Sequence, residues 1–312
     1  MRGERLTSTA LKISDLGKSY GSIQAVQSLS LTVETGEIVG LIGPDGAGKT
    51  TLMRLVCGLI AGDSGKVEVF GFNPAVEAKC VREVIGYMPQ KFSLYPDLSV
   101  SENIRFFADL YLVPAKEREL REARLMEFSM LGPFRNRRAG QLSGGMKQKL
   151  ALSCTLIHTP KLLILDEPTT GVDPVSRKEF WSILKDLASQ GIALLISTPY
   201  MDEAALCDRA ALMHKGRILT QGSPSEIISQ FGNRLLIVDS TELKSVQEIV
   251  GSATTSDYSI HRFGGSLHIV ADDAARILIN NSLSKAGFFS KEAEPSMEDA
   301  FVALLSKQGV GE

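Results

Sequence analysis

The sequence has few of the features that mark secreted, zinc-binding or membrane-spanning chains. It contains 4 cysteines and 4 histidines in 312 residues, and Cys57, Cys80, Cys154 and Cys207 are widely spaced with no C-x-x-C pair. This spacing excludes a disulfide framework and the usual zinc sites, and we interpret the cysteines as reduced core residues. The first ten residues lack an apolar segment and no stretch approaches 18 apolar residues, so we expect neither a signal peptide nor a transmembrane helix.

An excess of charge of either sign is also missing. The formal net charge is −2, which provides no global basic field, and we expect no nucleic-acid partner. Hydrophobic residues make up 44% of the chain and charged residues 22%, as in an ordinary globular protein. Because single cores seldom grow beyond about 250 to 300 residues, the length predicts two domains.

The most informative stretch is a glycine-rich loop between an apolar run at residues 38–42 and a helical pattern that begins near Leu52. Residues 43–51 fit the pattern G-x-x-x-x-G-K-[ST], whose glycines turn backbone N–H groups inward to form an anion-binding nest at a helix N-terminus. Lys49 is expected to reach the β- and γ-phosphates of a nucleotide, and Thr50 to ligate Mg²⁺. The predicted nucleotide-binding residues of this loop are Gly43, Pro44, Asp45, Gly46, Ala47, Gly48, Lys49, Thr50 and Thr51.

Strand patterns flank this loop on both sides. Residues 11–39 alternate in a way that predicts an antiparallel β layer against the nucleotide core, and residues 66–70 and 85–88 are predicted strands of a following strand–helix alternation. Residues 99–133 are helical and charge-rich, which indicates a helical insertion into an α/β domain. Tyr20 stands in the first loop, where its ring either stacks on adenine or simply packs.

Two further segments are candidates for binding phosphate or for acting on it. Ser143 is a suitable N-cap and the two glycines after it would expose backbone donors, so residues 142–149 are either a second anion site or an ordinary turn. Residues 162–165 are an apolar run that ends in Asp166 and Glu167, and the C-terminal edge of a buried parallel strand is where α/β sheets bind ligands. We predict that Asp166 holds Mg²⁺, directly or through water, and that Glu167 deprotonates the attacking water.

The order of these motifs over residues 11–225 resembles the ATP-binding subunits of ABC transporters, which are P-loop NTPases. In this resemblance residues 43–51 are the Walker A loop, residues 162–166 are Walker B, Gln90 is the Q-loop glutamine and Asp173 lies in the D-loop. The signature residues, which contact the nucleotide held by a partner chain, are Leu142, Ser143, Gly144, Gly145 and Met146.

The resemblance also implies roles for single residues. Tyr20 matches the position that stacks on adenine. Gln90 is expected to act with Glu167 in catalysis, and to join Thr50 and Asp166 around Mg²⁺.

Three segments narrow the resemblance to bacterial drug-exporter ATPases that partner ABC-2-type permeases: residues 169–174, 200–204 and 294–301. This implies an ATP- and Mg²⁺-dependent ATPase, peripheral at the cytoplasmic face of the inner (cell) membrane, with the permease on separate chains. It also implies a second ABC ATPase domain, in a homo- or heterodimer that sandwiches two ATP molecules. The permease is expected to dock near the cleft between Gln90 and the helical insertion.

Two positions depart from the family pattern. Asp45 places a carboxylate in the Walker A loop, and because this loop binds phosphate mainly through backbone N–H groups, we expect the side chain to point away from the nucleotide. Pro199 stands where the family has its switch histidine, and it has neither an N–H nor a side-chain donor. Loss of one transition-state donor lowers a rate by about 10²- to 10³-fold, so we predict a slow site on this chain's own Walker A unless Glu167 alone suffices. The four histidines lie elsewhere, and each is expected to be structural: His158, His214, His261 and His268.

The composition changes beyond about residue 231 and predicts a small second domain. Its expected elements are a strand at 234–238, a helix at 242–250, a hairpin of 258–263 and 266–270, a helix at 272–285 and a strand at 288–293. The order β-α-β-β-α-β is that of a ferredoxin-like α+β fold, and Ser296 begins a capping box for a final helix. The predicted divisions are a flexible N-terminus (1–10), an ABC ATPase domain (11–231, with a helical subdomain at about 92–142) and a C-terminal accessory or regulatory domain (232–312).

Two other functions remain as alternatives. The chain could be a nucleotide-gated, weakly hydrolysing partner in an asymmetric ABC dimer, as Pro199 suggests. A soluble ABC ATPase acting on ribosomes or DNA is less well supported, because such proteins usually carry two ATPase units or a long coiled-coil insertion. Drugs, lipids and polysaccharides all stay open as exported substrates, because in this family the substrate path lies in the permease.

Overall fold

The structure is a computed structural model, and it describes residues 8–91, 94–230, 235–254 and 258–307. The chain forms two compact units, Met1–Leu219 and Thr220–Glu312. The boundary between the units lies at residues 219 and 220, earlier than the predicted boundary at residue 231. Helix α8 (Pro224–Ser229) belongs to the second unit, where it packs against α11 (Met297–Lys307).

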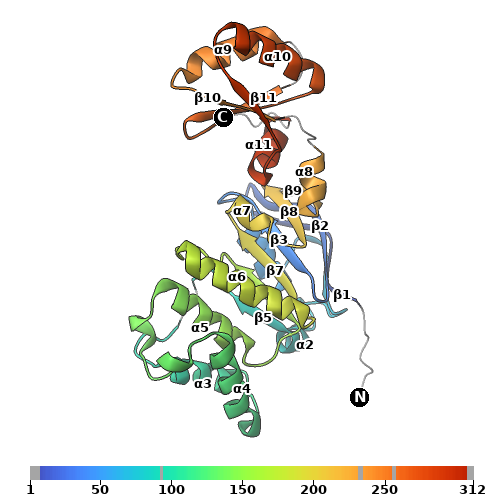
Figure 1. Ribbon diagram of the computed structural model, residues 1–312. Coiled ribbons are helices and arrows are strands. Elements are labelled where there is room, and N and C mark those ends of the chain that lie inside the picture. The colour runs from blue at the N-terminus through green and yellow to red at the C-terminus, as the bar shows by residue number, and fades with distance from the viewer. Residues whose placement is uncertain (1–7, 92–93, 231–234, 255–257, 308–312) are drawn as a thin grey trace. The chain divides into compact units, whose positions relative to one another are not determined.

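A six-stranded sheet lies at the centre of the first unit, with the strand order β5-β6-β7-β3-β8-β9 (Figure 1). Its strands are β3 (Ile38–Ile42), β5 (Ile85–Met88), β6 (Leu162–Asp166), β7 (Ala193–Thr198), β8 (Arg209–His214) and β9 (Arg217–Gly222). The first five of these are parallel to one another, and β3, β6 and β7 are buried throughout, as expected for runs of Leu, Ile and Val covered on both faces. Because β3 and β6 are parallel, the phosphate loop after β3 and the carboxylates at the end of β6 lie at the same edge of the sheet.

A three-stranded antiparallel sheet, in the order β2-β1-β4, makes the predicted β layer. Its strands are β1 (Thr9–Tyr20), β2 (Ile23–Glu34) and β4 (Ser64–Val69). The strand predicted at 66–70 therefore belongs to this layer and not to the parallel sheet, because it buries alternate residues, Val67 and Val69. The predicted flexible N-terminus is too long by two residues, since Thr9 and Ala10 are in β1 and Ala10 is fully buried; residues 1–7 lie outside the described part.

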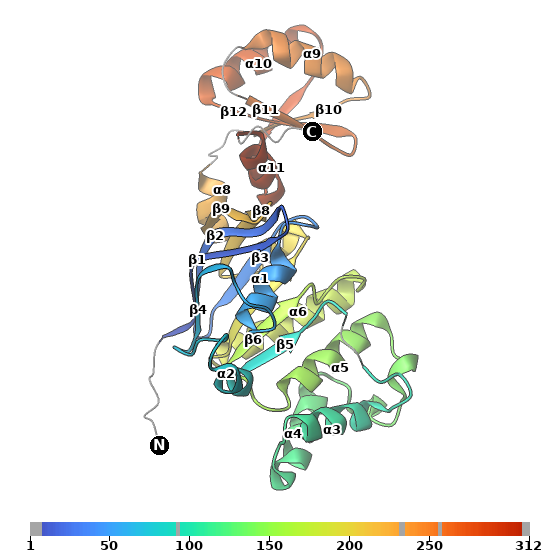
Figure 2. The same cartoon turned by 180° about the vertical axis from the view of Figure 1, so that it is seen from behind.

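Helices cover the two faces of the parallel sheet (Figures 1 and 2). The alternation along β6 shows the two sides: Leu162 and Ile164 pack with α1, while Leu163 and Leu165 pack with α5 and α6. These helices are α1 (Lys49–Val56), α5 (Gly144–Leu156) and α6 (Pro174–Ser189), and the shorter α2 (Ala78–Val84) and α7 (Met201–Ala204) precede β5 and β8.

The helical insertion has a core of its own. It consists of α3 (Val100–Leu110), α4 (Ala115–Phe128) and the 3₁₀ turns Gly132–Phe134 and Ala139–Gln141. Its apolar residues, such as Ile104 and Met126, pack with Leu150 and Cys154 of α5. Because α5 also packs on the parallel sheet, it joins the insertion to the nucleotide core.

The second unit contains a four-stranded antiparallel sheet in the order β11-β12-β10-β13. Its elements after α8 are β10 (Leu235–Asp239), α9 (Leu243–Ala253), β11 (Tyr258–Phe263), β12 (Ser266–Ala271), α10 (Asp273–Lys285), β13 (Ser290–Ala293) and α11. Helices α9 and α10 share one core with β10 and β12, and α11 contacts β11 and β12. Among the residues described in either unit, no helix is both long and apolar enough to cross a bilayer.

Candidate functional site

The phosphate loop connects β3 to α1 in a conformation that requires its glycines. Gly46 and Gly48 have φ angles of 79° and 104°, in the left-handed region that favours glycine. A Cβ atom on Gly48 would lie 2.2 Å from the Ala25 carbonyl oxygen, and one on Gly43 would lie 2.2 Å from that of Met213. The loop is therefore packed tightly between β2 and β8, and its shape depends on these residues.

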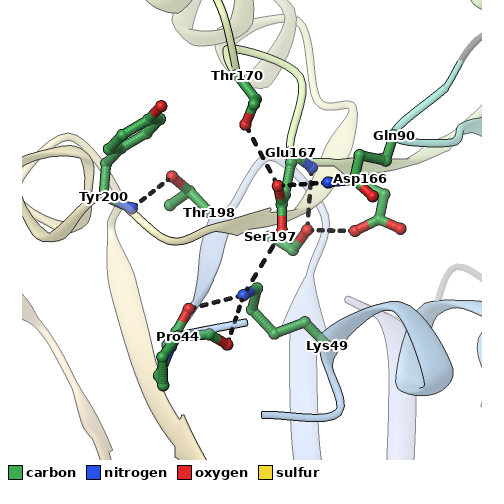
Figure 3. Close-up of polar contacts among 10 residues, drawn as sticks. Pro44, Lys49, Gln90, Asp166, Glu167, Thr170, Ser197, Thr198 and Tyr200 are labelled. Atoms are coloured by element: carbon green, nitrogen blue, oxygen red, sulfur yellow. Dashed lines mark hydrogen bonds and ion pairs between the residues drawn. The ribbon is translucent and has the colours of Figure 1, made fainter. Parts of the chain in front are cut away.

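Lys49, the first residue of α1, is buried and turned back over the loop (Figure 3). Its Nζ donates to the carbonyl oxygens of Gly43 at 2.6 Å and Pro44 at 3.0 Å. The same Nζ lies 3.6 Å from Oε1 of Glu167, and both side chains are more than nine-tenths buried. Lys49 thus occupies the space between the loop and the end of β6, where a phosphate group would need its charge.

Glu167 is held from several directions. Its backbone N–H donates to both the hydroxyl and the carbonyl oxygen of Ser197, at 3.0 and 3.1 Å, and its φ of 50° turns the chain sharply after β6. Its Oε2 accepts from Gln90 Nε2 at 2.8 Å and from the Thr170 hydroxyl at 3.3 Å (Figure 3). Two neutral donors therefore fix Oε2 of the carboxylate, and its Oε1 faces Lys49.

Asp166 presents one bonded and one unpartnered oxygen. Its Oδ1 accepts from the Ser197 hydroxyl at 2.6 Å, because β6 and β7 place Asp166 and Ser197 opposite each other. Its Oδ2 is buried and has no hydrogen-bond partner among the described residues. Burial, followed by the charge of Asp166, raises the pKa of the nearby Tyr87 to about 12, so that hydroxyl stays neutral.

Lys49, Gln90 and Glu167 line a cavity of about 520 Å³, whereas Asp166 is not in its lining. Its lining residues are Ile23, Gln24, Ala25, Gln27, Asp45, Gly46, Ala47, Gly48, Lys49, Thr50, Thr51, Gln90, Glu167 and Lys215. Asp45, expected to point away, is among them. Tyr20 is 48% exposed and pairs with the lining residue Ile23 at the end of the β1–β2 hairpin.

The predicted signature and D-loop residues meet at the starts of two helices. Ser143 is the N-cap of α5 and accepts from the Met146 N–H at 3.3 Å, and Asp173 is the N-cap of α6. Gly145 touches α6 so closely that a Cβ there would lie 2.5 Å from Cβ of Ser176. None of Leu142, Ser143, Gly144, Gly145 and Met146 is in the cavity lining given by the described residues.

Comparisons with known proteins agree on one family. A family model described as ABC transporter matches residues 26–170. The chain is 44% identical over 292 residues to the probable multidrug ABC transporter ATP-binding protein YbhF of Escherichia coli (strain K12), covering 92% of this chain and 50% of that protein. It is 34% identical over 307 residues to the Nod factor export ATP-binding protein I of Rhizobium etli (strain ATCC 51251), covering 98% of this chain and 96% of the relative. A solved ATP-binding subunit of an ABC transporter superposes with a TM-score of 0.65 at 30% identity, covering 72% of this chain and 94% of that one. The chain belongs to the ABC transporter ATPase family.

The family explains why the cavity brings these residues together, and the predicted resemblance is confirmed. The chain spans about half the length of YbhF, so the properties of that whole protein do not transfer by similarity alone. The fold of the first unit is the P-loop ABC ATPase fold that the motifs predicted, with its β layer and helical insertion.

The residues present fit a Mg²⁺–nucleotide complex. Asp166 offers a buried carboxylate oxygen without a partner in the described part of the chain, which is a hard oxygen ligand of the kind that Mg²⁺ takes. Thr50 and Gln90 line the adjoining cavity and would supply two further oxygens. The described residues contain no group of three or more His, Cys, Asp or Glu side chains that could hold a metal ion by themselves.

Pro199, the predicted switch position, follows directly after β7. The next residue, Tyr200, donates its N–H to the Thr198 hydroxyl at 3.0 Å. In Figure 3 the Tyr200 ring lies apart from Glu167, with Thr198 between them, and the Arg177 guanidinium lies over that ring, 4.3 Å from its centroid. The N–H and the ring of Tyr200 are thus both engaged within the protein. Ser197 and Thr170, which the motifs did not predict as site residues, contact Asp166 and Glu167 instead.

Proposed function

We propose that the chain binds and hydrolyses ATP to power an exporter whose permease, of the ABC-2 type, is formed by separate chains. The observation that carries this proposal is the cavity lined by the phosphate loop, Gln90 and Glu167. In it Glu167 contacts both Lys49 of the loop and Gln90. The relatives named above are described as a multidrug transporter ATPase and an exporter ATPase, which supports an export role.

We propose a role for each side chain of the cavity. The loop N–H groups and α1 would hold the phosphates, and Thr50, Gln90 and Asp166 would hold Mg²⁺, which supplies charge neutralisation of the phosphates. Lys49 would leave Glu167 for the phosphates, which frees the carboxylate to accept a proton from the attacking water. Gln90 and Thr170 would keep Oε2 of Glu167 in place while this happens.

We propose a dimer as the active form, homodimeric or with a second ABC ATPase. The signature residues at the N-terminus of α5 are outside the chain's own cavity, and their exposed donors at Ser143 and Gly144 suit a phosphate held by another chain. The Glu167→Gln chain, held with Mg²⁺-ATP, should run as a two-chain particle in size-exclusion chromatography, alone or mixed with the second ATPase. A chain that stays monomeric in both cases would contradict this assembly.

A groove next to the Q-loop is the proposed docking site for the permease, at the cytoplasmic face of the cell membrane. It has a volume of about 400 Å³ and is lined by Gln90, Lys91, Leu94, Pro96, Ala139, Gly140, Lys147, Gln148 and Ala151. Gln90 lies in this groove and also bonds Glu167, so a segment docked here touches the residue that holds the base. The groove thus provides a direct route from the permease to the catalytic carboxylate.

Membrane fractionation tests this docking. The wild type and a Lys66→Glu control, whose exposed lysine lies on β4, should sediment with membranes. The double variant Lys91→Glu/Lys147→Glu should appear in the supernatant while its ATP binding is unchanged. Equal recovery of all three chains in the membranes would contradict docking at this groove.

We also propose that the site on this chain's own Walker A is slow, because Pro199 cannot hold the γ-phosphate or the water. Single-turnover hydrolysis by the wild type and Pro199→His tests this. A large gain for Pro199→His supports a nucleotide-gated role in an asymmetric pair. Equal, fast rates would show that Glu167, held by Gln90 and Thr170, is sufficient.

A further inference from the structure

The nucleotide cavity contains a lysine that no motif predicts. Four charged side chains of the described residues line the cavity: Asp45, Lys49, Glu167 and Lys215. Lys49 lies 3.6 Å from Glu167, so part of its charge is already compensated within the protein. Without Lys215 the lining would hold two carboxylates and one ammonium group, an unfavourable balance for an anionic nucleotide.

The turn that carries Lys215 is fixed to both walls of the cavity. The N–H of Gly216 donates to the Ala47 carbonyl oxygen in the Walker A loop at 2.9 Å. On the other side, Gln27 of β2 donates its N–H to the Gly216 carbonyl oxygen at 2.8 Å and its Nε2 to that of Lys215 at 2.9 Å. Lys215 has a φ of 45°, so the chain turns at this residue directly beside the cavity. The backbone thereby holds Lys215 at one place on the rim.

The side chain of Lys215 is available for a ligand. It is exposed, and within the described part of the chain it forms no ion pair. Gln90 and Glu167, where we place the γ-phosphate, line the same cavity as Ile23 and Gln24 of β2. Its turn is bonded to Ala47 of the Walker A loop and to Gln27 of β2, so Lys215 lies on the part of the rim that these two segments form.

We propose that Lys215 is a nucleotide-binding residue whose ammonium group contacts the α- and β-phosphates and offsets the charge of Asp45. The inference builds on the proposed ATP-binding function and adds a residue to that site. Since the γ-phosphate is not involved, Lys215 should strengthen the binding of ATP and ADP equally.

Equilibrium binding of Mg²⁺-ATP and Mg²⁺-ADP to the full chain, measured by calorimetry at low salt, tests the proposal. Lys215→Met and Lys215→Gln should bind both nucleotides about three- to fivefold more weakly, the range expected for an exposed charge contact. Lys215→Arg should bind like the wild type, as should the control Lys66→Met. Asp45→Asn should bind both nucleotides more tightly, and adding KCl to about 0.5 M should reduce all of these differences because salt screens exposed charges.

The outcomes separate this inference from the function on which it builds. Unchanged affinity of both neutral variants would overturn the role of Lys215 while leaving ATP binding intact. A loss confined to ATP would contradict contact with the α- and β-phosphates. A wild-type chain that binds neither nucleotide would instead refute the proposed function itself.

Discussion

Replacing Ser197 by alanine should destabilise the ATPase unit more than any other loss of a single hydroxyl in the site. Ser197 is fully buried, and its hydroxyl is the donor that Asp166 Oδ1 accepts, at 2.6 Å. In the variant the Glu167 N–H can still donate to the carbonyl oxygen of residue 197, at 3.1 Å, so this backbone group does not lose its hydrogen-bond partner. The cost therefore comes from one buried carboxylate oxygen left without a partner, about 3 kcal/mol at the upper end of the usual range because the group is charged.

Thermal unfolding without nucleotide measures this cost. The chain has 1 tryptophan, the buried Trp181 of α6, so its fluorescence reports the first unit alone. A loss of about 3 kcal/mol corresponds to a fall in melting temperature of about 6 to 12 °C for a unit of this size. The control Ser189→Ala, which removes an exposed hydroxyl of the same helix as Trp181, should shift it by no more than about 2 °C.

A double-mutant cycle identifies the cause. In an Asp166→Asn background the charge is gone, and Ser197→Ala should cost less than about 1 kcal/mol. An equal cost in both backgrounds, or a Ser197→Ala chain as stable as the wild type, would refute the reasoning.

Three further results are expected. Thr170→Val should lower kcat about fivefold with unchanged ATP affinity, because it removes a donor to Glu167 Oε2. Thr170→Ser keeps the hydroxyl and should restore the rate. A change in ATP affinity in place of kcat would contradict a positioning role. Gly145→Ala should lower the free energy of unfolding by about 1 to 3 kcal/mol, because its Cβ would meet Ser176 at 2.5 Å, and adding Ser176→Gly should recover part of the loss; urea titration measures both. Burial lowers the pKa of His158 below 6.5, so the unfolded chain binds the proton more readily than the folded chain. The free energy of unfolding should therefore decline as the pH falls below 6.5, and it should decline less in His158→Gln. Parallel pH profiles of the two chains would contradict this.

The motifs that lie within one continuous segment could be predicted from the sequence. The phosphate loop is specified by its glycines and Lys49, and the end of β6 by an apolar run followed by two carboxylates. In each case the strand, the turn and the functional residue are neighbours in the chain. Local pattern alone therefore places them.

Contacts between distant segments could not be predicted in the same way. Ser197 meets Asp166 because β7 lies beside β6, and Lys215 reaches the cavity because β8 lies beside β3. Strand order decides both, and no local pattern encodes it. The prediction assigns the strand at 66–70 to the wrong sheet although a local signal is present: Val67 and Val69 alternate with polar residues, a pattern typical of a sheet covered on one face.

Hydrolysis of Mg²⁺-ATP by the chain assembled with its permease, compared with Glu167→Gln, tests the central claim most directly. The introduced amide would retain the size of the side chain and could still bond to its neighbours, but it would not accept the proton from water. We predict measurable turnover for the wild type and none for Glu167→Gln, with ATP binding kept in both. Turnover that survives the substitution would contradict the role of Glu167 and the mechanism built on it.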